Sequence, residues 1–224
     1  MTGGALPLRI VDACNLHSAH RQLLLPGELL RTPLGEVHRL PRFFYEVTST
    51  LEAVNTQLTP HFGLWEFMEV DLHEPEPLRT FPRYVPCAVT ALAAALEVLR
   101  VEIGASIRIA ANGGYRSPAH SGSRSASPHC WATAANIYRI GNEYLDSEEK
   151  VTRYADLASR VLPGCWTRPY GHEVGFADDH LHLDLGYGTL VPRNASELEE
   201  RPSAFVAPPL RPEEEGGPNP RRQR

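Results

Sequence analysis

The stretch NGGYRSPAHSGSRSASPHCWATAANI, residues 112–137, and the later stretch DDHLHLDLG, residues 178–186, decide how the chain is interpreted. The first is a polar loop rich in Gly, Ser and Pro between apolar runs, and such a long loop inside a domain is usually functional or disordered. The second alternates polar and apolar residues, which predicts a strand. Side chains alternate between the faces of a strand, so His180, His182 and Asp184 should share one face while the leucines face a core. Three potential ligands or bases on one face indicate a functional site.

The composition is that of a globular protein with one main domain. The 224 residues are 42% hydrophobic and 22% charged, with a formal net charge of -5. No Lys/Arg run precedes the last residues, which argues against a nucleic-acid partner. No apolar run approaches the ~20 residues that cross a bilayer, and the N-terminus lacks the features of a secretory signal. We therefore expect no membrane span, and a protein that is cytoplasmic or exported by a non-classical route.

Three segments are expected along the chain. Residues 1–42 contain Leu-rich fragments broken by prolines and predict an irregular N-terminal extension. Residues 43–191 carry the periodic patterns and the two site stretches, and form the predicted domain. Residues 192–224 are rich in Pro, Glu and Arg and almost free of aromatic residues, which predicts disorder. The four cysteines are scattered without a CxxC pair, so their disulfide state does not follow from the sequence.

The predicted domain mixes helices and strands. Apolar residues spaced by three and four predict amphipathic helices over residues 43–58 and 86–103, the second ended by Gly104. Asp146 and Glu149 form a plausible capping box for a helix that ends near Leu162. Strands are expected at residues 106–111, 134–140, 171–176 and 181–185. The predicted class is α+β, a small antiparallel sheet with flanking helices.

The two site stretches contain motifs in a fixed order. Gly114-Tyr115-Arg116-Ser117-Pro118 is followed by Ser127-x-His129, by Ala134, and finally by His182-x-Asp184-x-Gly186. This order and spacing resemble the zinc D-Ala-D-Ala metallopeptidases, the carboxypeptidases and endopeptidases of peptidoglycan peptides that share a fold with the hedgehog signalling domain. The resemblance covers roughly residues 60–190. It implies a hedgehog/DD-peptidase-like fold.

The resemblance also implies a metal centre. It places zinc (Zn²⁺) on His129, Asn136 and His182, with a fourth position left open for water. This chain departs from the family pattern at Asn136, where the family has an aspartate ligand, and at Ala132, where it has a glycine. An amide oxygen brings no charge, so zinc affinity should be weakened, or lost if Asn136 is not a ligand.

Catalytic and substrate roles follow from the same resemblance. Asp179 stands three residues before His182, the spacing of the general base in some members of the family, where it takes a proton from the attacking water. Asp184 would hold the imidazole of His182. Arg116 would bind a substrate carboxylate or stabilise developing negative charge. The expected substrate contacts are Tyr115, Ser127 and His180.

Two functions therefore stay open. The first is a zinc-dependent peptidase, of the D,D-carboxypeptidase or endopeptidase type, that hydrolyses D-Ala-containing peptidoglycan peptides or related small D-amino-acid peptides. The second is a catalytically inactive relative that binds cell-wall peptide or a protein partner through the same groove. A cysteine hydrolase that uses Cys130 beside His129 is a weaker third reading, since adjacent residues on an extended chain point apart.

Overall fold

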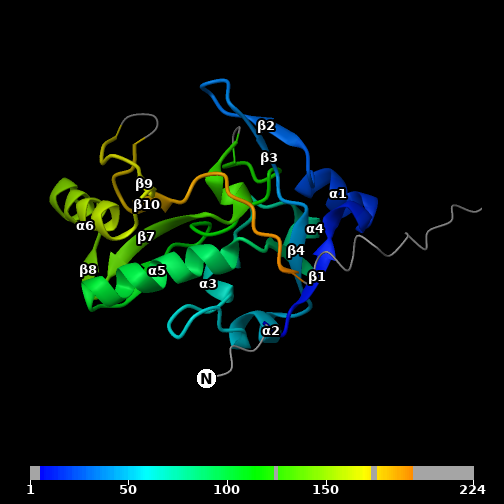
Figure 1. Cartoon of the computed structure of the whole chain (residues 1–224), viewed down its shortest axis with the longest axis horizontal. Helices are drawn as coiled ribbons and strands as arrows, with labels where there is room; N and C mark the ends of the chain where they lie inside the picture. Colours follow the sequence, from blue (N-terminus) through cyan, green and yellow to red (C-terminus); the bar gives the residue numbers. More distant parts are fainter. Residues whose placement is uncertain (1–5, 124–125, 173–175, 194–224) are drawn as a thin grey trace, which may run out of the picture.

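Helices and small antiparallel sheets are mixed along the chain, so the fold class is α+β (Figure 1). The structure, a computed structural model, describes residues 6–123, 126–172 and 176–193. Within these ranges no helix is long and apolar enough to cross a membrane. The helices are α1 (Ser18–Leu24), α2 (Thr50–Asn55), α3 (Trp65–Met68), α4 (Glu76–Arg79), α5 (Val89–Ile103) and α6 (Glu148–Val161), with short 3-10 turns η1 (Ala13–Asn15) and η2 (Pro128–Trp131).

Three antiparallel sheets organise the described strands. A three-stranded sheet has the order β1-β4-β5, a five-stranded sheet the order β6-β7-β10-β9 with β8 beside β7, and β2 pairs with β3 in a hairpin. The strands are β1 (Arg9–Asp12), β2 (Leu29–Arg31), β3 (Val37–Arg39), β4 (Phe43–Val47), β5 (Arg83–Pro86), β6 (Ile107–Ile109), β7 (Ala134–Ile140), β8 (Glu143–Tyr144), β9 (Trp166–Thr167) and β10 (Leu181–Asp184).

The core lies between α5 and the sheets. Leu92, Leu96 and Leu99 of α5 are fully buried, and so are Leu181 and Leu183 of β10, all in one apolar cluster. The apolar face predicted for residues 181–185 therefore packs inward. Gly104, in the left-handed conformation with φ 71°, ends α5 as the sequence predicted. The face of β10 that carries His182 and Asp184 is directed to the site.

The helix predicted over residues 43–58 is wrong in its first half. Residues 43–47 form β4 between β1 and β5, because Phe43, Phe44, Tyr45 and Val47 are aromatic or β-branched and all four are buried. A helix starts only after Ser49, whose hydroxyl accepts a hydrogen bond from the backbone N–H of Glu52 at 3.1 Å.

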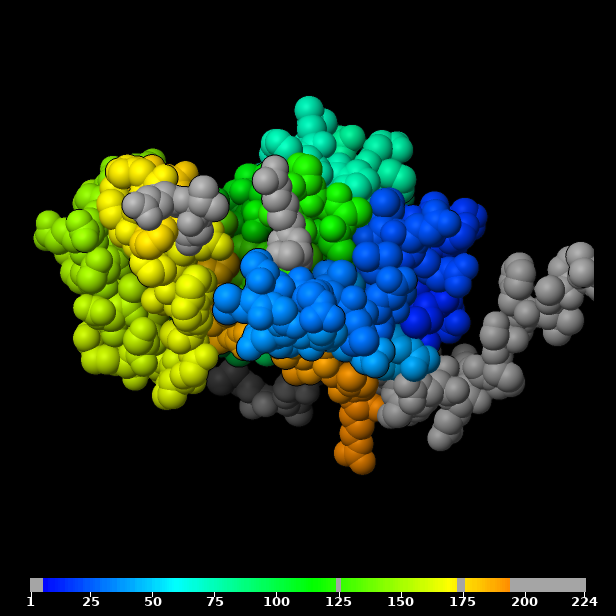
Figure 2. Space-filling model, turned by 90° about the horizontal axis from the view of Figure 1, so that it is seen from above, coloured from blue at the N-terminus to red at the C-terminus, as the bar shows by residue number. Residues whose placement is uncertain are grey.

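The described part of residues 1–42 is regular, not irregular as predicted. β1 pairs with β4 along its length, and its Ile10 and Val11 join the main core. The hairpin of β2 and β3 lies against the loop that carries the first site stretch (Figure 2). There the indole N–H of Trp131 donates to the carbonyl of Arg39 at 2.8 Å. The prolines interrupt the segment without preventing it from pairing.

Smaller predictions had mixed outcomes. The strand at residues 134–140 is confirmed as β7. α6 begins after Ser147, and Asp146 pairs with Lys150 at 2.7 Å in place of the predicted capping box. Residues 173–175 of the strand expected at 171–176 lie outside the described residues, as do residues 194–224 of the tail predicted to be disordered.

Candidate functional site

The site is built where η2, β7 and β10 meet. β7 and β10 are antiparallel neighbours, and their register places Asn136 directly opposite His182. His129 lies in η2, five residues before β7 begins at Ala134. The rings of His129 and His182 are 5.1 Å apart between centroids. Three residues that the resemblance assigns to zinc are thus brought together from two distant stretches of sequence.

His129 is held with one nitrogen free. Its side chain is buried, and its Nδ1 lies 2.7 Å from the carbonyl oxygen of Gly114, so Nδ1 carries the proton and donates. Its Nε2 is buried without a hydrogen-bond partner among the described residues. A Cβ at Gly114 would collide with the backbone of Phe67, so only glycine brings this carbonyl so close. The buried lone pair of Nε2 is available to a ligand.

His182 faces two oxygen atoms. Its Nδ1 lies 2.8 Å from Asn136 Oδ1, and its Nε2 lies 3.1 Å from Asp184 Oδ2. A neutral imidazole has one N–H, so it can donate to only one of these acceptors. Burial lowers the pKa of His182 despite the hydrogen bond to Asp184, which disfavours the doubly protonated ring. If His182 donates its single N–H to Asp184, its Nδ1 and Asn136 Oδ1 are two acceptors that face each other. This contact is favourable only if a cation lies between the two atoms or if the Asn136 amide presents its NH₂ group to the ring.

Burial and nearby cations also lower the pKa of His129. Burial is the largest cause, followed by Arg116 and then by His182, and Arg168 adds to the effect. Both imidazoles are therefore neutral at physiological pH. A neutral imidazole with a directed lone pair is the form that binds a metal.

The two candidate aspartates have different surroundings. Asp184 is buried, and its second oxygen accepts a hydrogen bond from the backbone N–H of Gly186 at 2.9 Å. It is placed to orient His182. The Asp179 side chain is 80% exposed and lies 2.5 Å from Nδ1 of His180. His180 in turn has a buried Nε2 without a partner among the described residues, and it contributes to the lowered pKa of His182.

Of the expected substrate contacts, Arg116 and Ser127 lie next to the histidine stretch, whereas Tyr115 lies in the core. Arg116 follows the Gly114 turn, and its backbone N–H donates to the carbonyl of His129 at 3.3 Å. Ser127 immediately precedes η2 and is half-buried. Tyr115 is buried against Phe44 on the core side of the loop, not beside the histidines. Its role is packing in this structure.

Cys130 is unsuited to nucleophilic catalysis. Its side chain is buried, and burial raises the pKa of its thiol to about 11. A thiolate is the nucleophile in cysteine hydrolases, and it would be scarce here at neutral pH. All four cysteines are free. The cysteine-hydrolase reading therefore loses support.

Three residues near the site were missed by the sequence analysis. Trp166 of β9 is half-exposed, with its ring 5.7 Å from that of His182. Arg168 follows β9, and its backbone N–H donates to the carbonyl of His182 at 3.1 Å. Glu74 is buried beneath the loop and accepts a hydrogen bond from the backbone N–H of Ser117 at 3.1 Å. Burial raises the pKa of Glu74. No motif marks these residues, because their place depends on strand register and loop packing.

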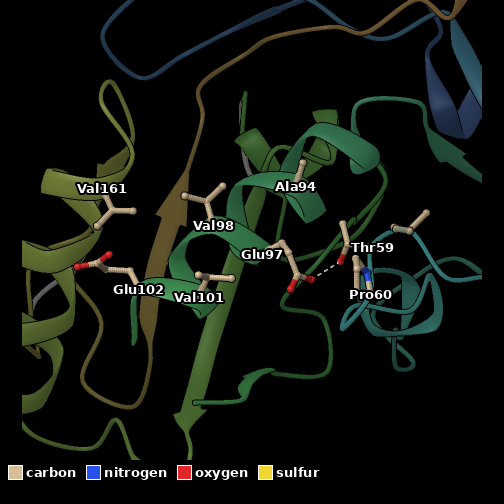
Figure 3. Close-up of a pocket in the computed structure, with 9 residues that line it drawn as sticks. Thr59, Pro60, Ala94, Glu97, Val98, Val101, Glu102 and Val161 are labelled. Atoms are coloured by element: carbon tan, nitrogen blue, oxygen red, sulfur yellow. Dashed lines mark hydrogen bonds between the residues drawn. The ribbon is translucent and has the colours of Figure 1, made fainter. Parts of the chain in front are cut away.

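A separate hollow of about 480 Å³ lies beside α5 (Figure 3). Its walls are mainly apolar side chains of α5, including Val98 and Val101, together with Val161 of α6. Glu97 borders it and accepts a hydrogen bond from the Thr59 hydroxyl at 2.7 Å. None of the predicted site residues lines this hollow.

The donor set fits a metal ion of the zinc type, but with a weaker third ligand than usual. Among the described residues, no group of three or more His, Cys, Asp or Glu side chains could hold a metal. The set at this site consists of two imidazoles and the amide of Asn136. The buried Nε2 of His129 and the facing Nδ1 and Oδ1 atoms of His182 and Asn136 are the donors that a zinc ion would use.

Comparisons with protein-family models, with curated proteins and with solved structures found no match to this chain.

Proposed function

We propose that this protein is a zinc-dependent peptidase of hedgehog/DD-peptidase-like fold that hydrolyses D-Ala-containing peptidoglycan peptides. The observation that carries the proposal is that the acceptor atoms around His129 and His182 outnumber the available hydrogen-bond donors. His129 Nε2 has no partner, and neutral His182 faces acceptors at both ring nitrogens. A cation between His182 Nδ1 and Asn136 Oδ1 would remove this conflict, with His182 donating its single N–H to Asp184.

His129, Asn136 and His182 would hold the metal. Bound zinc would supply a Lewis acid that polarises the peptide carbonyl and makes a water molecule more acidic. The Gly114 carbonyl fixes the tautomer of His129, and Asp184 fixes that of His182. These two contacts are the kind of support that histidine ligands usually have.

The remaining polar groups suit proton transfer and charge stabilisation. With Nδ1 of His180 donating to Asp179, its Nε2 lone pair is free to take a proton from an attacking water. His180 lies immediately before β10, two residues from His182. Arg116 provides a planar cation for the negative charge that develops on the carbonyl oxygen. Asp179 would then act through His180, not as the base itself.

A second candidate is a binding protein without catalysis. It is favoured by one observation, the amide at position 136. If the NH₂ group of Asn136 donates to Nδ1 of His182, every contact of His182 is satisfied without a metal. In that state the same residues would bind a cell-wall peptide or a protein partner through the groove.

Metal content and hydrolysis distinguish the two candidates. The protein is reconstituted with zinc, dialysed and analysed for bound metal, and hydrolysis of acetyl-Lys-D-Ala-D-Ala is followed before and after chelation. We expect about one zinc per chain and cleavage that the chelator abolishes. His129→Gln should abolish both, whereas His172→Gln, at an exposed histidine paired with Asp178, should change neither. A chain that retains no zinc after reconstitution would rule out the enzyme.

A further inference from the structure

The sheet face that carries Asn136 continues along β7 beyond the histidines. Side chains alternate along a strand, so Asn136 and Tyr138 face one side while Ile137 faces the other. Ile137 is fully buried in the main core, whereas Asn136 and Tyr138 are half-buried. Tyr138 therefore lies on the same face of the sheet as the site, two residues or roughly 7 Å farther along β7.

A β-bulge adds Arg139 to this face. Ile109 of β6 pairs with Ile137 of β7. The residue before it, Arg108, pairs with Arg139, so Tyr138 is an extra residue in β7. At such a bulge two residues of one strand lie opposite one residue of the neighbouring strand. The guanidinium of Arg139 accordingly lies 6.0 Å from the centre of the Tyr138 ring.

Strand β8 places Tyr144 on the other side of Arg139. Tyr144 and Arg139 are directly paired, so their side chains share a face. The Tyr144 ring is 53% exposed, and its centre lies 5.7 Å from the Arg139 guanidinium and 6.1 Å from the Tyr138 ring. The neighbouring Glu143 points to the opposite face, where its carboxylate accepts hydrogen bonds from two side chains of α6. It is therefore not a counter-charge for Arg139.

Four side chains thus form an arginine–tyrosine surface next to the site: Arg108, Tyr138, Arg139 and Tyr144. The two arginines are direct neighbours across β6 and β7, and like charges in this position destabilise a sheet. Neither of them forms an ion pair with a carboxylate within residues 6–123, 126–172 and 176–193. Nε of Arg139 is also buried without a hydrogen-bond partner in these ranges. The surface therefore holds two cations without a counter-charge.

We propose that the arginine–tyrosine surface binds an acidic segment of a peptide that extends along the sheet from the site. A guanidinium offers paired N–H donors to a carboxylate, and the tyrosine rings offer apolar contact area. An extended peptide advances about 3.3 Å per residue, so a carboxylate two or three residues from the group at the histidines would reach Arg139. Nucleic acid fits less well, because two cations neutralise few phosphates and the chain carries a net charge of -5.

Two matched peptides test the proposal without zinc or hydrolysis. The probes are fluorescently labelled Glu-Ala-Glu-Ala-Glu amide and Gln-Ala-Gln-Ala-Gln amide, which differ only in side-chain charge. Fluorescence anisotropy with the full chain, in a chelator and low salt, should show the Glu peptide bound roughly tenfold or more tightly than the Gln peptide. Arg139→Gln should remove most of this preference. Arg139→Lys should retain part of it, because it keeps the charge but not the planar fork.

Arg108→Gln, at an exposed residue, should weaken the preference in the same direction without disturbing the core. Arg160→Gln is the control, because it removes the same charge from an exposed arginine of α6, and it should leave the preference unchanged. Equal affinity for both peptides, undetectable binding of both, or a preference that survives in Arg139→Gln would overturn the proposal. Tighter, Arg139-dependent binding of labelled single-stranded oligothymidylate would also overturn it and assign the surface to nucleic acid.

The result is separate from that of the proposed function. If the chain binds no zinc but prefers the Glu peptide through Arg139, the arginine–tyrosine surface stands and the peptidase fails. If zinc-dependent cleavage is found without that preference, the peptidase stands and the surface fails.

Discussion

Asn136 is the side chain on which the chemistry at His182 depends. Its Oδ1 faces Nδ1 of His182 at 2.8 Å, while Asp184 takes the other ring nitrogen. An amide can turn either an oxygen or an NH₂ group toward the ring, whereas a carboxylate can only accept. The group that Asn136 turns toward His182 therefore decides whether the site is a metal centre or a hydrogen-bond network without metal.

Asn136→Asp should raise zinc affinity by roughly tenfold or more, because a full negative charge replaces a neutral dipole beside the cation. Competition against a chromogenic chelator measures the change. Asn55→Asp, at the last residue of α2, is the matched control because it makes the same replacement away from the site, and it should leave zinc affinity unchanged. Equal zinc affinity in the Asn136→Asp and unmodified chains would mean that position 136 does not face the metal.

The buried histidines predict how stability depends on pH in the metal-free protein. Burial lowers the folded-state pKa of both His129 and His182 below the unfolded value. Neutral histidine therefore contributes stability above about pH 6.5, and this stability is lost as the pH falls toward the folded-state pKa. The slope is at most about 1.4 kcal/mol per pH unit for each histidine.

Urea unfolding from about pH 8 to about pH 5, with a chelator present, measures this slope. His129→Gln should flatten the loss of stability on the acid side, even though the substitution itself lowers the free energy of unfolding. Asn55→Gln, at a non-titrating residue of α2 away from the site, should leave the slope unchanged. An identical slope in the chain and in His129→Gln would show that His129 titrates equally in both states.

At the residue scale, alternation and spacing predicted part of the site. The shared face of His182 and Asp184 could be predicted because a strand fixes the direction of alternate side chains. The pairing of Asn136 with His182 came only from the family resemblance, since nothing in a single sequence relates positions 46 residues apart. The contact of His129 with the Gly114 carbonyl, and the burial of Tyr115 beside Phe44, depend on the folded loop.

At the element scale, long periodic segments were predicted better than short ones. α5 was predicted because its apolar stripe, alanine content and Gly104 stop all agree. The pattern at residues 43–58 failed because a strand followed by a short helix also placed Phe44, Val47 and Leu51 at spacings of three and four. A period read across a boundary between two elements does not distinguish them.

α5 offers a matched pair of substitutions that tests where the core lies. Leu96 is fully buried, and Val98 is 52% exposed on the same helix. Leu96→Ala should lower the free energy of unfolding by about 2–5 kcal/mol through lost burial and a cavity. Val98→Ala should change it by about 0.5 kcal/mol or less. Chemical denaturation measures both changes. A similar loss in the two variants would mean that the buried face of α5 is not the one that carries Leu96.

β9 shows why Arg168 and Trp166 could not be predicted. The strand is two residues long and has no alternation of its own that could reveal a face. Its side chains acquire a direction only through the register with β10, where Asp184 meets Trp166. Short edge strands owe their orientation to their neighbours.

At the scale of the whole molecule, residues 6–42 belong to the main fold. β1 completes the sheet of β4 and β5, and Ile10, Val11 and Leu24 lie in the main core. Leu40 belongs to a second cluster with Trp131, which stands two residues after His129 in the chain. The prolines in this segment predicted an irregular extension. They could not reveal that β1 pairs with β4, because this pairing joins residues far apart in the sequence.

A chain that spans residues 43–193 should therefore lose cooperative unfolding. Removal of Ile10, Val11, Leu24 and Leu40 takes away about 1.5–3 kcal/mol of burial for each side chain, a sum comparable with the ~5–15 kcal/mol of a typical domain. It also leaves β4 with an unpaired edge.

Thermal unfolding followed by circular dichroism, together with binding of a hydrophobic dye, measures the effect against a chain of residues 6–193. Replacement of residues 28–39 alone by a short Gly-Ser linker keeps β1 and the main core, so it should preserve a cooperative transition. The midpoint should be lower, because the contacts of the hairpin with Trp131, Ala126 and Tyr187 are lost. If the 43–193 chain unfolded as sharply and at the same temperature as the longer one, β1 would not contribute to the stability of the sheet.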